Sequence, residues 1–101
     1  MIYNLGSKIY GFLYIVQEGK CLRTHPNRVK IGMSEKQNDD RLKVYGKNRI
    51  VLKKFNCHYD CVRLLERKLI KIFTNKFTLV DGETERFEGD IEEMRKVFNE
   101  I

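Results

Sequence analysis

The chain has few cysteines, and their number is odd. Cys21, Cys57 and Cys61 are the three cysteines among its 101 residues. An odd number argues against the disulfide framework of a small secreted protein and favours a reducing, intracellular environment. Cys57, His58 and Cys61 suggest a zinc site, but the second closely spaced ligand pair that structural zinc sites usually have is lacking. The alternative is that these cysteines are buried or surface thiols.

Long hydrophobic runs are also lacking. No stretch reaches the roughly 18 apolar residues that a membrane-spanning helix needs, so we expect no contact with a membrane. The apolar stretch at 9–16 has only Lys8 ahead of it and lacks a small-residue cleavage site. We therefore expect a strand there, not a signal peptide, with residues 1–8 as an arm or an edge.

Acidic residues are fewer than basic ones. The chain has 20 lysines and arginines against 14 acidic residues, which gives a formal charge of +6. A surplus of this size on so small a protein favours a polyanionic partner, although many small domains are basic without one. With 101 residues, of which 42% are hydrophobic, the chain is expected to form one domain around one modest core.

Proline occurs once, in the polar segment 17–26, which is expected to form a long hairpin loop. Runs of β-branched and aromatic residues predict strands, and helical spacing with capping residues predicts helices. The predicted strands are 9–16, 27–32, 50–55 and a short one at 85–87, and the predicted helices are 40–45, 60–73 and 90–101. These elements predict an α+β fold in which a small, three-stranded, mainly antiparallel sheet is flanked by helices.

One carboxylate stands out in the predicted helix 60–73. The apolar residues of this helix recur at helical spacing and form a stripe that is expected to face the core. Glu66 falls beside that stripe, where a carboxylate is unfavourable unless a cation or a metal ion meets it. The alternative is that Glu66 lies at the edge of the stripe and pairs with Arg63, one turn back, in solvent.

The segment 29–45 gathers polar groups at the end of a strand. Gly32 allows the backbone to bend or to approach another group closely. One of the polar residues at 38–40 is expected to cap the next helix, in which Arg41 and Tyr45 are four residues apart and share a face. With Lys30 on the strand, these side chains suit an anionic substrate, most plausibly a phosphate.

The order of these motifs resembles the GIY-YIG nuclease superfamily, in the short type of phages and large DNA viruses. The matching residues are Phe-Leu-Tyr at 12–14, Lys-Ile-Gly at 30–32, Arg41, Leu-Leu-Glu-Arg-Lys-Leu-Ile-Lys at 64–71 and Gly-Glu-Thr-Glu-Arg-Phe at 82–87. The segment 64–71 is close to a pattern of the excision-repair nuclease subunit of that superfamily. The resemblance covers about 9–88, within a single domain of 1–101 whose last helix, 90–101, is expected only to pack.

The sequence also departs from the family pattern. The first motif keeps only Tyr14, and Lys30 replaces the tyrosine of the second motif, as it does in some phage, viral and restriction-type members. The hairpin loop is longer than usual. The trailing asparagine of the pattern has no clear match, although Asn75 lies near the right region.

The resemblance implies a metal-dependent endonuclease that hydrolyses DNA phosphodiester bonds. Glu66 would hold one Mg²⁺ or Mn²⁺, and Arg41 would hold the non-bridging phosphate oxygens. Tyr14 would contact or deprotonate the attacking water, and Lys30 beside it would lower its pKa. Tyr45 would bind a phosphate oxygen or orient the water. Each of these residues has a structural alternative. Tyr14 would be a core aromatic residue, and Lys30 would be a surface charge. Arg41 and Tyr45 would be an exposed pair on a helix.

Several cations are expected to follow the DNA backbone, with a solvated surface as the alternative for each. The leading candidates are Arg28, Lys36, Lys43 and Lys47. A chain of 101 residues has little room for a sequence-reading module. We therefore expect cleavage that is nonspecific, structure-specific or dependent on a homodimer or a partner protein for targeting. The resemblance also points to a viral or phage protein, in the cytoplasm or nucleus of a host.

Two other functional hypotheses remain from the sequence. One is a catalytically weak or inactive nucleic-acid-binding module with the same fold, and the other is a structural or protein-interaction domain whose basic charge is incidental. Convergence of Tyr14, Lys30, Arg41 and Glu66 would favour catalysis. A Glu66 turned to solvent, away from the other three, would argue against it.

Overall fold

A computed structural model describes residues 10–36 and 39–101. The expected N-terminal arm, the first residue of the predicted strand 9–16 and the candidate cap Asn38 lie outside these ranges. The described elements are β1 (Tyr10–Gln17), the short 3-10 helix η2 (Gly19–Cys21), β2 (Arg28–Ser34), α2 (Asp40–Lys43), β3 (Ile50–His58), α3 (Tyr59–Lys76), β4 (Thr78–Leu79), β5 (Arg86–Glu88) and α4 (Ile91–Asn99).

The predicted α+β fold is confirmed. The strands form one five-stranded sheet in the order β3-β1-β2-β5-β4, and every pairing in it is antiparallel. The three main strands are the predicted ones. The sheet is wider than the three strands expected because two short strands extend it: β5, which corresponds to the strand predicted at 85–87, pairs with β2, and β4 pairs with β5.

Several predicted boundaries were wrong. The strand β3 continues through His58 because residues 56–58 pair with 10–12 of β1, so tertiary pairing overrides their polar composition. The helix α3 continues to Lys76, three residues beyond the predicted end at 73, and therefore includes Asn75. The helix α2 ends at Lys43, so Tyr45 follows it; the chain then turns at Gly46, whose φ of 98° favours glycine.

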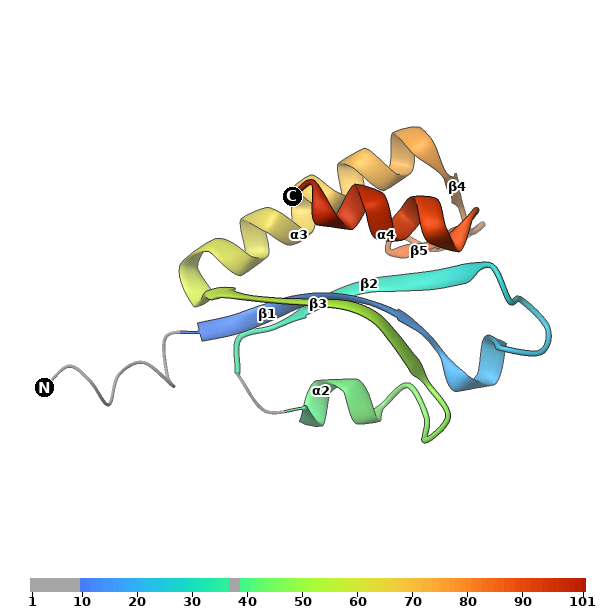
Figure 1. The fold of residues 1–101 in the computed structure, drawn as a ribbon, viewed down its shortest axis with the longest axis horizontal. Helices are drawn as coiled ribbons and strands as arrows, with labels where there is room; N and C mark the ends of the chain where they lie inside the picture. Colours follow the sequence, from blue (N-terminus) through green and yellow to red (C-terminus); the bar gives the residue numbers. More distant parts are fainter. Residues whose placement is uncertain (1–9, 37–38) are drawn as a thin grey trace, which may run out of the picture.

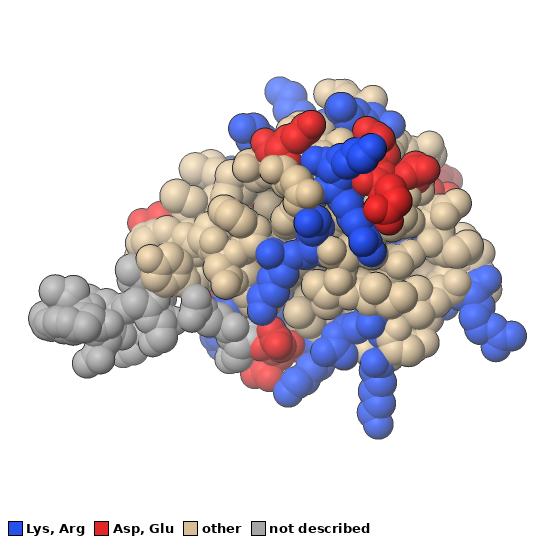
Figure 2. All heavy atoms as spheres, viewed as in Figure 1, with Lys and Arg blue, Asp and Glu red and all other residues tan. Residues whose placement is uncertain are grey.

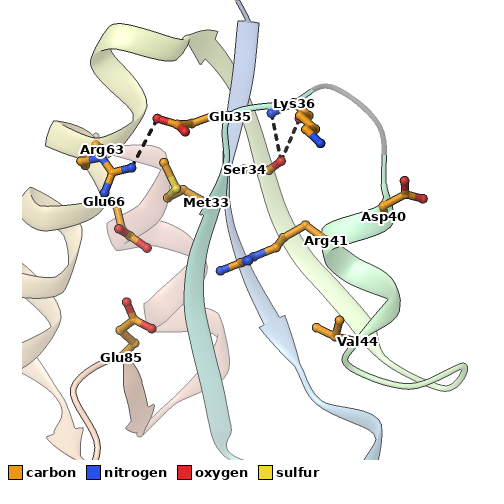
Figure 3. A pocket seen from close by; sticks show the side chains of 10 residues that line it. All are labelled: Met33, Ser34, Glu35, Lys36, Asp40, Arg41, Val44, Arg63, Glu66 and Glu85. Carbon is orange, nitrogen blue, oxygen red and sulfur yellow. Dashed lines mark hydrogen bonds and ion pairs between the residues drawn. The ribbon is translucent and has the colours of Figure 1, made fainter.

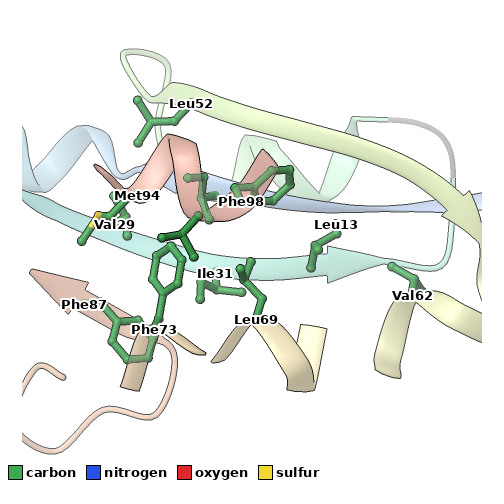
Figure 4. Close-up of a cluster of buried hydrophobic side chains, with 12 residues drawn as sticks. Leu13, Val29, Ile31, Leu52, Val62, Leu69, Phe73, Phe87, Met94 and Phe98 are labelled. Carbon is green, nitrogen blue, oxygen red and sulfur yellow. The ribbon is translucent and has the colours of Figure 1, made fainter. Parts of the chain in front are cut away.

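The two faces of the sheet are covered differently. The long helices α3 and α4 lie on one face, and the short helix α2 lies on the other (Figure 1). Leu13 and Ile31 point from the sheet toward Leu69 and Phe73 of α3, and α4 adds further apolar side chains (Figure 4). This larger core holds the fold together, since burying each such side chain contributes about 1.5 to 3 kcal/mol.

A smaller cluster lies beneath α2. Phe12, Tyr14 and Val16 of β1 alternate with the residues of the larger core and pack against Leu42 and Tyr45. This alternation, which the sequence of β1 hides because both faces are apolar, is typical of a strand buried on both sides. The small cluster therefore attaches α2 and the following segment to the sheet.

The sheet has an open edge on β2. The strand β5 pairs only with Arg28, Val29 and Lys30 of β2, and the last of the backbone bonds runs from the Ile31 N–H to the Glu85 carbonyl. In the described part of the chain, the outer side of β2 beyond this point has no neighbouring strand. At this edge, the layer formed by α3 and α4 and the layer formed by α2 face each other without a described strand between them. No described helix is long and apolar enough to cross a membrane.

Candidate active site

A cavity of about 650 Å³ lies at the open edge of β2, within the size range of ligand pockets. Its walls come from both layers of the molecule: the end of β2 and the residues after it, α2, α3 and the segment before β5 (Figure 3). The lining residues are Met33, Ser34, Glu35, Lys36, Asp40, Arg41, Val44, Arg63, Glu66 and Glu85. Three regions that are far apart in the sequence, namely 33–36 with 40–44, 63–66 and residue 85, therefore meet at one place.

Arg41 reaches into this cavity from α2. Figure 3 shows its guanidinium group pointing across the edge of β2 toward Glu66 and Glu85. A side-chain hydrogen bond to Tyr14 is the main reason that the pKa of Arg41 is raised, and the nearby Glu66 adds to the effect. Arg41 is therefore held as a cation between the small cluster and the carboxylates on the far wall.

Tyr14 and Tyr45 form a pair behind Arg41. Their phenol oxygens are 2.7 Å apart, and their rings meet edge to face. Tyr14 is fully buried at 0% exposure, and Tyr45 is 8% exposed. Burial, followed by the hydrogen bond to Tyr14, raises the pKa of Tyr45 well above its ordinary value, so this phenol stays neutral at physiological pH.

Gly32 is the residue that makes room for Tyr14. The two residues face each other in the β1–β2 register, and a Cβ atom at position 32 would overlap the phenol ring of Tyr14. The close approach expected from this glycine is thus an approach by an aromatic side chain of the same protein. It brings the Tyr14 hydroxyl over the β2 backbone, next to the open edge.

Glu66 faces the cavity from α3. Burial is the main reason that its pKa is raised, and the charge of Glu85 raises it further, while Lys30, Arg63 and Arg41 act in the opposite direction. Among the described residues, its carboxylate has no hydrogen bond or ion pair. The alternative of a solvent pair with Arg63 is not observed, because Arg63 binds Glu35 instead at 3.3 Å.

Lys30 has a partner that the sequence interpretation missed. Its ammonium group forms a short ion pair with Glu85, a residue 55 positions away. Lys30 was expected to act on Tyr14 through its charge, but the carboxylate of Glu85 offsets much of that charge. The sequence predicted the short strand 85–87, which begins at Glu85. It did not indicate that this strand would pair with β2 and so bring Glu85 beside Lys30.

A second ion-pair network lies next to Lys30. Arg86 donates two hydrogen bonds to the buried carboxylate of Glu18, at 2.7 and 3.0 Å, and a third to Glu83 at 2.7 Å. Because Arg86 binds it, the pKa of Glu18 is lowered. The network links the hairpin loop to β5 and so fixes the segment that carries Glu85.

Only part of the predicted DNA-binding set is available. Arg28 binds Glu88 at 2.8 Å, and Lys43 lies 3.1 Å from Asp40. Lys36 lines the cavity, and within ranges 10–36 and 39–101 neither Lys36 nor Lys47 has a carboxylate partner. Two of the four predicted cations are therefore already neutralised within the protein.

The oxygen donors of the cavity suit a hard cation. Glu66 and Glu85 face the same space, and one or two carboxylates with water are the usual ligands of Mg²⁺ in nuclease-like sites. No group of three or more His, Cys, Asp or Glu side chains that could hold a metal comes together among the described residues, and this includes the Cys57–Cys61 segment. Water would therefore complete any coordination at Glu66.

Taken together, the site places a cation, Arg41, opposite a half-buried carboxylate, Glu66, with a phenol behind the cation. The chain matches the family model described as the T5orf172 domain over residues 11–101, which includes every cavity-lining residue. This family occurs in phages and elsewhere and is associated with nuclease and DNA-binding functions. Neither the curated proteins nor the solved structures include a significant match.

Proposed function

Because the chain belongs to the T5orf172 domain family, we propose that it is a metal-dependent endonuclease of the GIY-YIG type that hydrolyses DNA phosphodiester bonds. The observation that carries this proposal is the meeting of Arg41 and Glu66 across the open edge of β2. A phosphodiester is an anion that needs a cation on its oxygens and a metal ligand close by, and these two residues supply both from opposite walls.

Arg41 is proposed to bind the non-bridging oxygens of the scissile phosphate. Its planar guanidinium group presents paired N–H donors, and a raised pKa keeps it charged at any working pH. This group lies beside the Tyr14 phenol and points into the cavity (Figure 3). Lys30 is proposed to take a supporting role, since its charge is shared with Glu85 until a phosphate competes for it.

Tyr14 is proposed to orient or deprotonate the attacking water. Its buried hydroxyl lies over Gly32 and beside Arg41, and it shares a 2.7 Å hydrogen bond with Tyr45. Tyr45 is buried and points at Tyr14, so we assign it a positioning role, in place of the direct contact with phosphate or water expected from the sequence. The hydrogen bond between the two phenols holds the Tyr14 hydroxyl in position.

Glu66 is proposed to hold one Mg²⁺ or Mn²⁺, with Glu85 as the nearest further carboxylate. The fit rests on the donor set: a half-buried carboxylate without an internal partner among the described residues, facing an open cavity. When bound, the metal would polarise the phosphate and stabilise the leaving oxygen. Glu66 itself must be ionised to act as a ligand, which its raised pKa opposes and a nearby cation favours.

One observation favours the alternative of a catalytically weak nucleic-acid-binding module. Tyr14 is fully buried and is not among the residues that line the cavity, so its hydroxyl has no direct access to water in this arrangement. A protein that keeps this arrangement for stability alone would bind DNA without cutting it.

The deciding experiment is nicking of supercoiled plasmid in Mg²⁺ or Mn²⁺. We expect metal-dependent nicking that falls by about 10²- to 10³-fold or more in Glu66→Gln and in Arg41→Lys, because each removes a group that acts on the developing charge. Glu92→Gln, which changes an exposed carboxylate on α4, serves as the matched control and should nick at the original rate.

Two outcomes would overturn the proposal. Nicking that persists in EDTA, or that survives in Glu66→Gln, would show that Glu66 is not a metal ligand for this reaction. Salt-sensitive DNA binding without nicking, unchanged in both variants, would establish the binding module instead.

A further inference from the structure

We infer that the solvent-facing side of α3 holds the phosphate backbone of duplex DNA next to the cavity. This inference rests on the proposed function, because it names the surface by which the substrate of that site is held. The surface consists of Arg67, Lys68 and Lys71, which are all exposed, and it begins at Arg63 on the cavity wall. None of these residues was among the DNA contacts predicted from the sequence.

The spacing of these cations makes a continuous stripe. Arg63, Arg67 and Lys71 are each four residues apart and therefore lie on one face of α3, with Lys68 beside them. At about 1.5 Å per residue, the stripe is about 12 Å long, which is enough to contact about two to three consecutive phosphates of a DNA strand. The stripe is thus long enough for several consecutive phosphates.

The charges of the stripe are available to a ligand. Among the described residues, Arg67, Lys68 and Lys71 have no carboxylate partner, and Glu66 is the only acidic residue of α3 after its first turn. In contrast, Arg28 and Lys43 are neutralised by Glu88 and Asp40. A phosphate backbone would meet Arg67, Lys68 and Lys71 without breaking an ion pair, and only Arg63 of the stripe would have to leave a partner, Glu35. The predicted contacts at Arg28 and Lys43 would both require an ion pair to be broken.

The stripe is placed where a bound strand would continue. Arg63 and Glu66 project from α3 into the cavity (Figure 3), so the stripe starts at its wall and leads away from it. Basic side chains stand out along the upper rim of the molecule, where α3 lies in the same view of Figure 1 (Figure 2). A strand whose phosphate lies between Arg41 and Glu66 would therefore pass directly onto the outer side of α3.

The test measures binding separately from cleavage. A fluorescently labelled DNA duplex is titrated with the full chain in EDTA, and the association constant is followed by anisotropy over a range of salt concentrations. Each phosphate contact contributes about 0.9 to the slope of log K against log salt. The variant with Arg67→Ala, Lys68→Ala and Lys71→Ala should therefore lose about 2 to 3 from the slope, while Arg67→Lys alone should keep it.

The control removes the same charge elsewhere. A variant with Lys20→Ala, Arg23→Ala and Lys96→Ala, whose positions lie outside both the cavity wall and α3, should keep the original slope. An unchanged slope in the α3 variant, or an equal loss in the control, would overturn the inference, and so would the absence of binding by the original protein. Plasmid nicking tests the proposed function independently, since the α3 variant retains Arg41 and Glu66.

Discussion

The two faces of the sheet differ in how much apolar packing covers them. On one face, α3 and α4 cover a continuous apolar core with Phe73 and Leu69 at its centre. On the other face, α2 covers only five buried residues, and charged pairs around Arg86 and Lys30 occupy the remainder. The cavity lies where the faces meet, between α3, which packs on the larger core, and α2, which packs on the smaller cluster. The difference suggests that the chemistry depends on the thinner layer.

The largest effect on stability is expected in the larger core. Phe73→Ala removes a fully buried ring that contacts Phe77 and Phe87, and should lower the free energy of unfolding by about 3 to 5 kcal/mol. Leu42→Ala, in the small cluster, is the matched change on the other face and should cost about 2 to 3 kcal/mol. Urea denaturation measures both. Equal losses would remove the distinction between the two faces.

A smaller effect is expected in the charged network. Glu18→Gln leaves Arg86 with Glu83 alone, and should lower the free energy of unfolding at neutral pH by about 1 to 3 kcal/mol. The pKa of Glu18 is lowered in the folded state, so its contribution is present above the ordinary carboxyl pKa and is lost as pH falls through the folded value.

The original protein and Glu18→Gln should therefore converge in stability at acidic pH. Thermal melts at a series of pH values check this, with Glu92→Gln as a control for a surface pair that contributes little. A constant difference between the two proteins down to acidic pH would contradict the role given to Glu18.

The smallest effect on stability is expected at the phenol pair, where the effect on activity is more informative. Tyr45→Phe removes the 2.7 Å hydrogen bond to Tyr14 and should cost about 1 kcal/mol in unfolding. If the bond positions Tyr14, nicking should slow by about tenfold, and Tyr14→Phe should slow it much more. Tyr59→Phe, at an exposed position, is the control. Equal nicking by Tyr45→Phe and the original protein would limit this pair to packing.

The sequence predicted the main strands and the long helices, because strong periodicity and local turn signals determine these features. The meeting of Arg41 with Glu66 was expected only from the resemblance to the GIY-YIG superfamily. It did not predict the partner of Lys30 or of Glu18, since Glu85 and Arg86 lie 55 and 68 residues away and meet them only through the pairing of β5 with β2. The two-sided burial of β1 was hidden for a different reason: an apolar run without alternation does not tell which residues face which layer.

The contact of Gly32 with the ring of Tyr14 also restricts the order in which mutations can accumulate. Any side chain at position 32 is excluded while the tyrosine is present, whereas the tyrosine can be replaced by a smaller residue while the glycine remains. The effect of a substitution at position 32 therefore depends on the residue at position 14. After Tyr14 is replaced by a smaller residue, position 32 can accept a side chain. Once position 32 carries a side chain, a tyrosine at position 14 would overlap it, so the tyrosine returns only after glycine is restored.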